Sequence, residues 1–192
     1  CRNDVDLSCI LEDLKFFTKE FIKNATFTNE EVDYLNTITD NKSEYLREFT
    51  SKPLPIHVDD FIIDVNGKEL IIRVKGPLWA YIFIEVPMLY KVNELYNNAK
   101  YPNWEDRLKL FEEGNIRLTE KIKLLNANPG VKIMEFGTRR RFSKEWQKKV
   151  LQRLLNETTN IVGTSNVALA KEFGITPLGT TAHLYSQVYQ AI

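Results

Sequence analysis

Three consecutive arginines and three Gly-Thr pairs are the residues of this 192-residue chain that point most directly to anion chemistry. The pairs are Gly137-Thr138, Gly163-Thr164 and Gly179-Thr180, and each follows an apolar residue at a predicted strand end. Glycine lets a backbone approach a ligand closely, threonine offers a hydroxyl, and a helix that follows presents unpaired N–H groups. Because this combination suits phosphate, the pairs are candidate phosphate contacts.

Arg139, Arg140 and Arg141 stand where a predicted strand ends and a predicted helix begins. The helix dipole repels cations at an N-terminus by roughly 0.3–1 kcal/mol each. An anion bound between the arginines and the helix start would offset this repulsion. The alternative is that the Gly-Thr pairs only make turns and that the arginines are solvated or paired with Glu135 and Glu145.

His183 follows the third Gly-Thr pair and is a candidate acid, base or nucleophile. An imidazole whose pKa is near the reference value of ~6.5 is largely neutral at physiological pH. The other histidine, His57, lies in a proline-rich stretch and is expected at the surface. No second histidine or cysteine accompanies His183, and Cys1 and Cys9 lack metal-site spacing, so the sequence predicts no metal site.

Composition excludes several classes of protein. Hydrophobic residues make up 43% of the chain and charged residues 27%, which is ordinary for a globular protein and argues against wholesale disorder. The 26 basic and 26 acidic residues cancel, so net charge gives no reason to expect nucleic acid or an anionic membrane as partner. Two cysteines are too few for a disulfide framework, so we expect a reducing cytoplasmic location. No apolar run reaches the ~18–20 residues that span a bilayer.

The elements that position these residues divide the chain into two predicted domains. Residues 1–128 predict an α+β domain with a helical linker. Its predicted helices are Ser8–Asn24, Asn29–Ile38, Ser43–Phe49, Leu78–Ala99 and Trp104–Leu125, with a β-hairpin at Phe61–Val65 and Leu70–Val74. The first helix has Ile10, Leu14, Phe17 and Phe21 on one face, and Asn66-Gly67 supplies the positive φ that the hairpin turn needs.

Residues 129–192 alternate between predicted strands and helices. The strands are Val131–Phe136, Ile161-Val162 and Pro177-Leu178, and the helices are Ser143–Leu155, Val167–Phe173 and Leu184–Ile192. Such alternation predicts an α/β fold with a parallel sheet or a (β/α) barrel. Because parallel strands have their carboxyl ends at one edge, we expect the three Gly-Thr pairs to lie around one crevice.

Three blocks of this region resemble the nicotinate phosphoribosyltransferase family. They are EFGTRRRFSKEW from Glu135, VGTSNVALA from Val162 and GITPLGTTAH from Gly174, in the order and spacing of that family. Upstream, GPLW from Gly76 and EVPML from Glu85 are similar to the family pattern as well. The resemblance implies an α/β N-terminal domain followed by the first βα units of an irregular (β/α) barrel, as in type II phosphoribosyltransferases.

The same resemblance implies an ATP-dependent enzyme of NAD biosynthesis that forms nicotinate mononucleotide from nicotinate and phosphoribosyl pyrophosphate. It makes His183 the histidine that ATP phosphorylates, Phe136 the aromatic that stacks on the pyridine ring, and Arg139 the arginine at the phosphate and ring site. Thr180 would help to hold nicotinate. Ser165 stands where nicotinamide-using relatives have an aspartate, which would repel the carboxylate of nicotinate.

Thr138, Gly163, Thr164 and Gly179 are weaker phosphate-binding candidates, and Mg²⁺ is expected to accompany phosphoribosyl pyrophosphate and ATP. A homodimer is also implied, with neither nucleic acid nor membrane as partner. Two features depart from the family pattern: Leu184-Tyr185 replaces Glu-Trp after the motif histidine, and the family's enzymes are about twice as long. We therefore expect this chain to be a piece, lacking the extreme N-terminus and the C-terminal half, that does not turn over alone. The alternatives are a non-catalytic phosphate-binding or dimerisation fragment, and quinolinate phosphoribosyltransferase.

Overall fold

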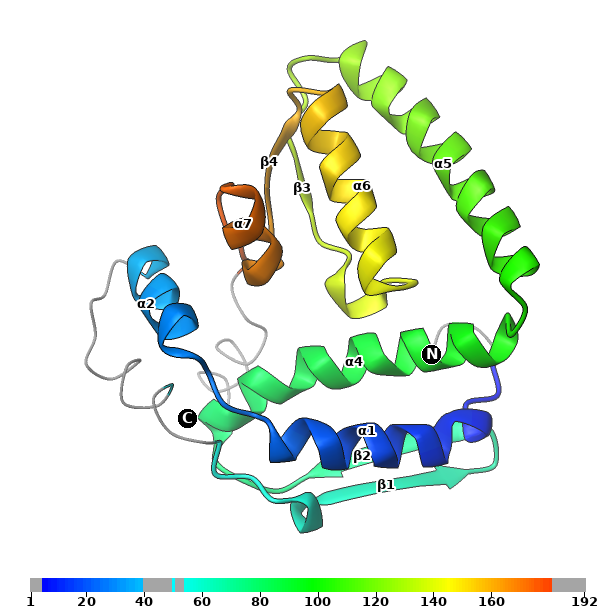
Figure 1. The fold of residues 1–192 in the computed structure, drawn as a ribbon, viewed down its shortest axis with the longest axis vertical. Helices are drawn as coiled ribbons and strands as arrows, with labels where there is room; N and C mark the ends of the chain where they lie inside the picture. Colours follow the sequence, from blue (N-terminus) through cyan, green and yellow to red (C-terminus); the bar gives the residue numbers. More distant parts are fainter. Residues whose placement is uncertain (1–4, 40–49, 51–53, 181–192) are drawn as a thin grey trace, which may run out of the picture. The chain divides into compact units, whose positions relative to one another are not determined.

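The computed structural model of the protein describes residues 5–39, 50 and 54–180 (Figure 1). The chain divides into two compact units. The first comprises Cys1–Asn115 and Thr138–Gln147, and the second comprises Ile116–Gly137 and Lys148–Ile192. The chain thus leaves the second unit after Gly137 and returns to it within a helix. The predicted domain boundary between residues 128 and 129 stays a prediction.

The first unit begins with a short 3-10 turn, η1 (Ser8–Ile10), that continues into helix α1 (Leu11–Lys23). The predicted helix and its apolar face are confirmed, because Ile10 and Leu14 are fully buried and Phe17 and Phe21 pack against the core. Helix α2 (Asn29–Ile38) has its predicted bounds. It starts at a capping box in which Thr28 Oγ1 accepts from the Glu31 N–H and the Thr28 N–H donates to Glu31 Oε2. The predicted helix Ser43–Phe49 lies outside the described residues.

The predicted hairpin is confirmed as strands β1 (Phe61–Asn66) and β2 (Glu69–Val74), which pair antiparallel. Gly67 has a φ of 60°, whereas no other described hairpin residue has a positive φ, so the turn needs glycine only there. A 3-10 turn, η2 (Val58–Asp60), precedes β1, and the N–H of His57 donates to Asp60 Oδ2 over 2.7 Å. His57 is exposed, as predicted.

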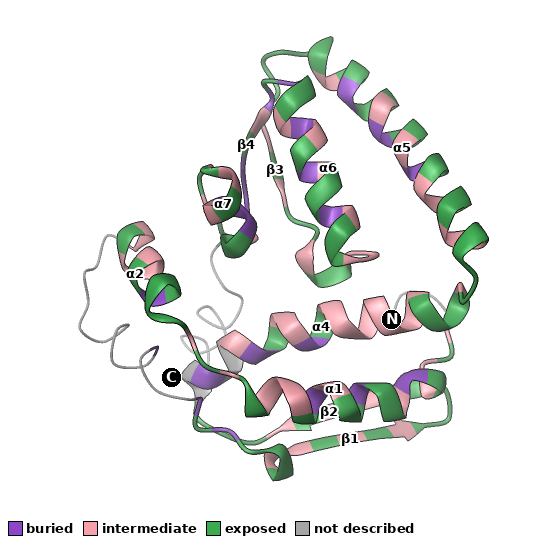
Figure 2. Ribbon diagram, viewed as in Figure 1, coloured by how far each residue is buried: buried purple, intermediate pink, exposed green. Residues whose placement is uncertain are grey.

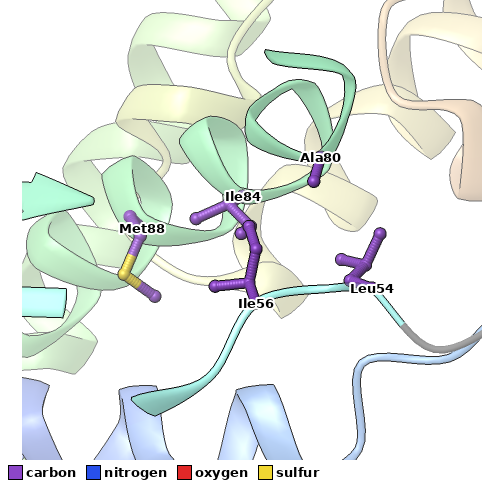
Figure 3. Close-up of a cluster of buried hydrophobic side chains, with 5 residues drawn as sticks. All are labelled: Leu54, Ile56, Ala80, Ile84 and Met88. Atoms are coloured by element: carbon purple, nitrogen blue, oxygen red, sulfur yellow. The ribbon is translucent and has the colours of Figure 1, made fainter. Parts of the chain in front are cut away.

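Helix α4 (Leu78–Lys100) forms one side of the core of the first unit. Ala80, Ile84 and Met88 recur every four residues and are buried, and Figure 2 shows buried positions along α4. They pack with Leu54 and Ile56 of the segment before the hairpin (Figure 3). Pro87 lies inside α4 and does not end it, so a turn starting at Pro87, which a proline inside a predicted helix would suggest, is not found. The spacing of the buried residues shows why this long apolar stretch forms a helix.

Helix α5 (Trp104–Asn126) and helix α6 (Lys144–Glu157) each contribute residues to both units. Within the first unit the Phe111 ring stacks on the Trp146 ring at a centroid distance of 5.4 Å and meets Phe142 edge-on. A Cβ at Gly114 would lie 2.6 and 2.8 Å from two atoms of the Trp146 indole. Gly114 therefore makes room for an aromatic ring, although glycine inside a helix weakens it.

The second unit is built on two parallel strands, β3 (Ile133–Glu135) and β4 (Ile161–Thr164), connected through α6. A 3-10 turn, η3 (Thr138–Arg140), separates β3 from α6. Helix α7 (Val167–Phe173) follows β4, starts at Asn166, whose side chain accepts from the Leu169 N–H, and stops at Gly174 with a φ of 63°. Ser143, at the predicted start of the helix, caps α6, because Ser143 Oγ accepts from the Trp146 N–H.

One face of the β3–β4 pair is covered by apolar residues of α5 and α6. Leu118, Ile122 and Leu154 are buried there, with Ile133 and Ile161 of the strands packed against them. Beyond β4 a parallel bridge between Thr164 and Pro177 adds one more extended segment. The predicted α/β class is confirmed, but no barrel is seen among the described residues: their parallel segments form an open edge, whereas a closed (β/α) barrel has eight strands.

The buried side chain of Asn160 fixes the segment that leads into β3. Its Nδ2 donates to the carbonyls of Asn128 and Val131, and its Oδ1 accepts from the Thr158 hydroxyl over 2.6 Å. The side chain thereby satisfies polar groups that burial would otherwise leave unpaired. Among the described residues, no helix combines the length and apolar character needed to cross a membrane.

Substituting Gly114→Ala should lower the free energy of unfolding by about 1–3 kcal/mol, because the added methyl overlaps the Trp146 ring. The sign is informative, since alanine is otherwise favoured over glycine inside a helix by ~1 kcal/mol. Urea unfolding followed by circular dichroism measures the change. In a Trp146→Phe background, which removes the overlapping ring atoms, the same substitution should be neutral or stabilising. Equal destabilisation in both backgrounds would contradict this packing.

Candidate functional site

In the second unit, the pairing of β3 with β4 brings the strand end before Gly137 beside the Gly163-Thr164 pair, whereas Thr138 belongs to the first unit. Glu135 is in register with Thr164, and Thr164 in turn bridges Pro177, which precedes the third pair. The Leu178 N–H donates to the Thr164 carbonyl over 2.9 Å, and the Thr164 N–H donates to the Thr176 carbonyl. The second pair forms the end of β4 itself, so the expectation of a turn at that pair is wrong.

Glu135 joins these strand ends, and the sequence analysis missed this role. Its Oε2 accepts from the Thr164 hydroxyl over 2.6 Å, its Oε1 accepts from the Gly137 N–H over 2.5 Å, and its carbonyl accepts from the Ser165 N–H. The Thr164 hydroxyl accepts from the Asn166 N–H, so it is engaged on both sides. A carboxylate directly after an apolar strand, opposite a threonine on the next strand, is the signal from which this contact could have been predicted.

Gly163 lies close to the backbone of Thr176. A Cβ at this position would clash with the Thr176 carbonyl and lie 2.8 Å from Leu178 Cδ1. Thr164 is completely buried. The observed need for glycine at residue 163 therefore comes from the packing of β4 against the 176–178 segment. A contact of Gly163 or Thr164 with phosphate stays a prediction. At Gly179, by contrast, an added Cβ would meet no atom within 4 Å.

An exposed apolar face accompanies the strand ends. Phe136 is 50% exposed, and Met134 of β3 and Val162 of β4 are exposed as well. Ser165 is half-buried and Thr180 is exposed. An exposed aromatic ring such as that of Phe136 offers a face on which a heteroaromatic ring can stack.

The arginines lie in the first unit, in and just after the 3-10 turn η3, which packs against helix α4. Arg139 Nη1 is 3.1 Å from Glu85 Oε1, and both side chains are more than half exposed. Arg141 donates from Nε to Glu94 Oε1 over 2.7 Å, and only 9% of its side chain is exposed. The alternative of pairing with carboxylates is thus seen for Arg139 and Arg141, and these two carboxylates lie more than 40 residues upstream, because the turn before α6 packs on α4. Arg140 is exposed.

Further groups surround the Arg141 guanidinium. Its central carbon lies 3.9 Å from the centroid of the Tyr90 ring, and Nη1 donates to Gln147 Oε1 over 3.4 Å. Gln147 Nε2 donates in turn to Thr138 Oγ1. Burial raises the pKa of the Tyr90 hydroxyl, although the charge of Arg141 opposes the shift. At the start of α6 a hydrogen bond from its own backbone N–H, then the Ser143 hydroxyl, lowers the pKa of Glu145.

His183 lies outside the described residues, as does the predicted helix Leu184–Ile192, so the position of the candidate nucleophile stays a prediction. Within the described ranges no group of three or more His, Cys, Asp or Glu side chains could hold a metal ion. A depression of about 450 Å³ lies between α1 and the hairpin, but none of its lining residues is a predicted site residue.

Two family profiles match this chain. The nicotinate phosphoribosyltransferase (NAPRTase) N-terminal domain matches residues 2–93, and the nicotinate phosphoribosyltransferase (NAPRTase) family matches residues 131–192. The chain belongs to the nicotinate phosphoribosyltransferase family. The suspected family is therefore confirmed, and both matches cover motif blocks quoted from the sequence.

Curated members of the nicotinate phosphoribosyltransferase family resemble the chain along its whole length. The nicotinate phosphoribosyltransferase of Burkholderia mallei is 37% identical over 204 aligned residues, covering 100% of this chain and 48% of the relative. That of Chromobacterium violaceum is 36% identical over 206 residues, covering 100% and 49%. The chain thus spans about half the length of these relatives.

Solved structures of the same family share the fold. A nicotinate phosphoribosyltransferase structure from Vibrio cholerae superposes with a TM-score of 0.79 at 23% identity, covering 99% of this chain and 46% of that one. One from Porphyromonas gingivalis gives a TM-score of 0.71 at 23% identity, covering 90% and 44%. At this level of identity the likeness is evidence for the fold alone.

Replacing the buried hydroxyl with a methyl, in Thr164→Val, should lower the free energy of unfolding by about 1.5–3 kcal/mol, because Glu135 loses a charged hydrogen bond. Chemical unfolding of the chain measures this change. In a Glu135→Ala background the same substitution should cost at least ~1 kcal/mol less, since the partner is already gone. Strictly additive costs would show that the two side chains do not interact.

Proposed function

We propose that the protein containing this chain joins nicotinate to phosphoribosyl pyrophosphate, with ATP hydrolysis, to form nicotinate mononucleotide for NAD biosynthesis. The observation that carries the proposal is the 37% identity to the Burkholderia mallei nicotinate phosphoribosyltransferase over every residue of the chain. Because the chain spans about half of that relative, the described residues supply only part of a site. We propose the homodimer that the family resemblance implies as well.

The proposed ring site uses Phe136, Ser165 and Thr180. The half-exposed Phe136 ring at the end of β3 offers a face on which a pyridine ring can stack. Ser165 follows β4, where its backbone is held to Glu135, and its neutral side chain leaves room for the carboxylate of nicotinate. Thr180 is exposed and would donate or accept a hydrogen bond.

The proposed anion site uses Arg139, whose exposed pairing with Glu85 is of the kind that a substrate anion can displace. Gly179, in the second unit, is proposed as a separate phosphate contact, because an added Cβ there would meet no atom of the described residues within 4 Å. Thr138 is weaker support because its hydroxyl accepts from Gln147. Mg²⁺ would enter on the phosphate oxygens of phosphoribosyl pyrophosphate and ATP and would offset their negative charge.

His183 is proposed to attack the γ-phosphorus of ATP through a neutral imidazole nitrogen. The new N–P bond forms as the bond from phosphorus to the bridging oxygen of ADP breaks, and ADP leaves with the electron pair. Hydrolysis of the phosphohistidine returns the imidazole and phosphate. Leu184-Tyr185, in place of the Glu-Trp common in the family, removes an acidic neighbour that could tune this histidine.

Ser165→Asp should lower kcat/KM for nicotinate by about tenfold or more, because a carboxylate there repels the substrate carboxylate. The relative rate with nicotinamide should rise, since its amide can donate to the new carboxylate. The measurement is mononucleotide formation by the complete reading frame that contains this chain. Ser165→Asn is the matched control, because asparagine has the shape of aspartate without its charge. This variant should lose much less nicotinate turnover. Equal loss in both variants would contradict an electrostatic role.

His183→Ala should abolish the ATP-dependent part of nicotinate turnover and the incorporation of γ-³²P into protein. Product analysis of the complete reading frame, with and without ATP, tests this. Activity unaffected by the substitution would remove His183 from the mechanism. ATP-independent turnover of quinolinate, or no turnover of either substrate by the unaltered protein, would favour the alternatives of quinolinate phosphoribosyltransferase or a non-catalytic fragment.

A further inference from the structure

Arg141 is the most buried of the three arginines and is held on several sides. Glu94 Oε1 accepts from its Nε over 2.7 Å, the Tyr90 ring lies 3.9 Å below its guanidinium carbon, and Gln147 accepts from Nη1. Its side chain is 9% exposed and that of Glu94 is 16% exposed. A guanidinium held in this way cannot reach a substrate without breaking its largely buried ion pair with Glu94, which would cost free energy.

Arg139, two residues earlier, has the opposite environment. Its side chain is 54% exposed, and that of its ion-pair partner Glu85 is 55% exposed. Exposed pairs of this kind are weak and exchange readily with other ions. The backbone of Arg139 is nevertheless fixed, because its carbonyl accepts from Asn93 Nδ2 over 3.0 Å. The side chain is thus available for a ligand while the main chain is held.

Several contacts between described residues hold the turn from Thr138 to Arg141 within the first unit, among them three hydrogen bonds. Gln147 donates to the Thr138 hydroxyl, Asn93 donates to the Arg139 carbonyl, and Glu94 binds the Arg141 side chain. Two of these attachments come from adjacent residues of α4. The Arg141 contact is the one that is both charged and buried, so it should contribute most to holding the turn.

We propose that Arg141 is a positioning residue: by packing between Glu94 and Tyr90 it fixes the 138–141 turn on α4, so that Arg139 is presented to the phosphate-bearing substrate. This inference rests on the proposed function, and it gives the adjacent arginines different tasks. Arginine suits this place better than lysine because one planar group both pairs with a carboxylate and stacks on an aromatic face.

Glu94 has a second cation nearby, since Lys91 Nζ lies 3.9 Å from its Oε2. Lys91 is itself placed over the Phe17 ring. A weakened contact at Arg141 therefore leaves Glu94 partly compensated, and the conservative Arg141→Lys variant should fold. The expected effect is a loosened turn within an intact unit.

The test compares Arg141→Lys with Arg140→Lys in the complete reading frame that contains this chain. Arg141→Lys should raise KM for phosphoribosyl pyrophosphate about tenfold with kcat changed less than about threefold, because misplacement of a binding group weakens substrate binding. Amide hydrogen exchange should become at least about tenfold faster in residues 138–141 and stay unchanged in α1 and the hairpin. Arg140→Lys, an exposed neighbour with the same change of chemistry, should leave both measurements unchanged.

The two readouts separate this inference from the proposed function. If the unaltered protein forms no nicotinate mononucleotide, the proposed function fails, and hydrogen exchange still decides whether Arg141 fixes the turn. If the unaltered protein is active but Arg141→Lys has the original KM, or if residues 138–141 exchange no faster, the positioning role is overturned. A uniform rise in exchange across the first unit would also overturn it, because it would show a general structural role.

Discussion

The burial of Arg141 against α4 is the interaction on which the path of the chain through its two units depends. After β3 the chain leaves the second unit, and residues 138–147 belong to the first before α6 returns to the second. A buried cation is costly unless it is paired and hydrogen-bonded. Glu94 and Tyr90 meet that need, while Phe111 stacks on Trp146 and Gly114 leaves room for the indole. Together these contacts explain why a ten-residue segment groups with a unit that is remote in sequence.

The ion pair of Arg141 with Glu94 also explains how three consecutive arginines can stand before a helix. Repulsion from the dipole of α6 is worth only a fraction of a kcal/mol to ~1 kcal/mol per charge, and Ser143 and Glu145 already improve the helix start. A buried hydrogen bond to a charged group contributes more free energy than that repulsion costs. A bound anion is therefore not required to account for Arg141, and the case for an anion site rests on Arg139, whose exposed pairing with Glu85 can be exchanged.

In the second unit, residues with similar sequence signals have different tasks. Gly163 and Thr164 shape the sheet, one by admitting the Thr176 backbone and the other by binding Glu135. Gly179 faces open space, and Phe136 is half exposed at the end of β3. The repeated Gly-Thr pair thus has no single physical meaning: its role depends on which neighbour fills the space beside it. Gly179 and Phe136, which are exposed, are the residues that a ligand can reach.

The sequence by itself determined the local elements, because the rules that govern them act within about four residues. The apolar spacing of α1, the positive φ at Gly67, the Ser143 cap and the stop at Gly174 were all predictable, and the motif blocks identified the family. Only the tertiary structure decided the partners of the arginines, since Glu94 lies 47 residues before Arg141. It also decided why Gly114 and Gly163 must be small and that Glu135 binds Thr164. Such contacts join residues that are distant in the chain. They depend on how whole helices and strands pack, and a local sequence pattern carries no information about that packing.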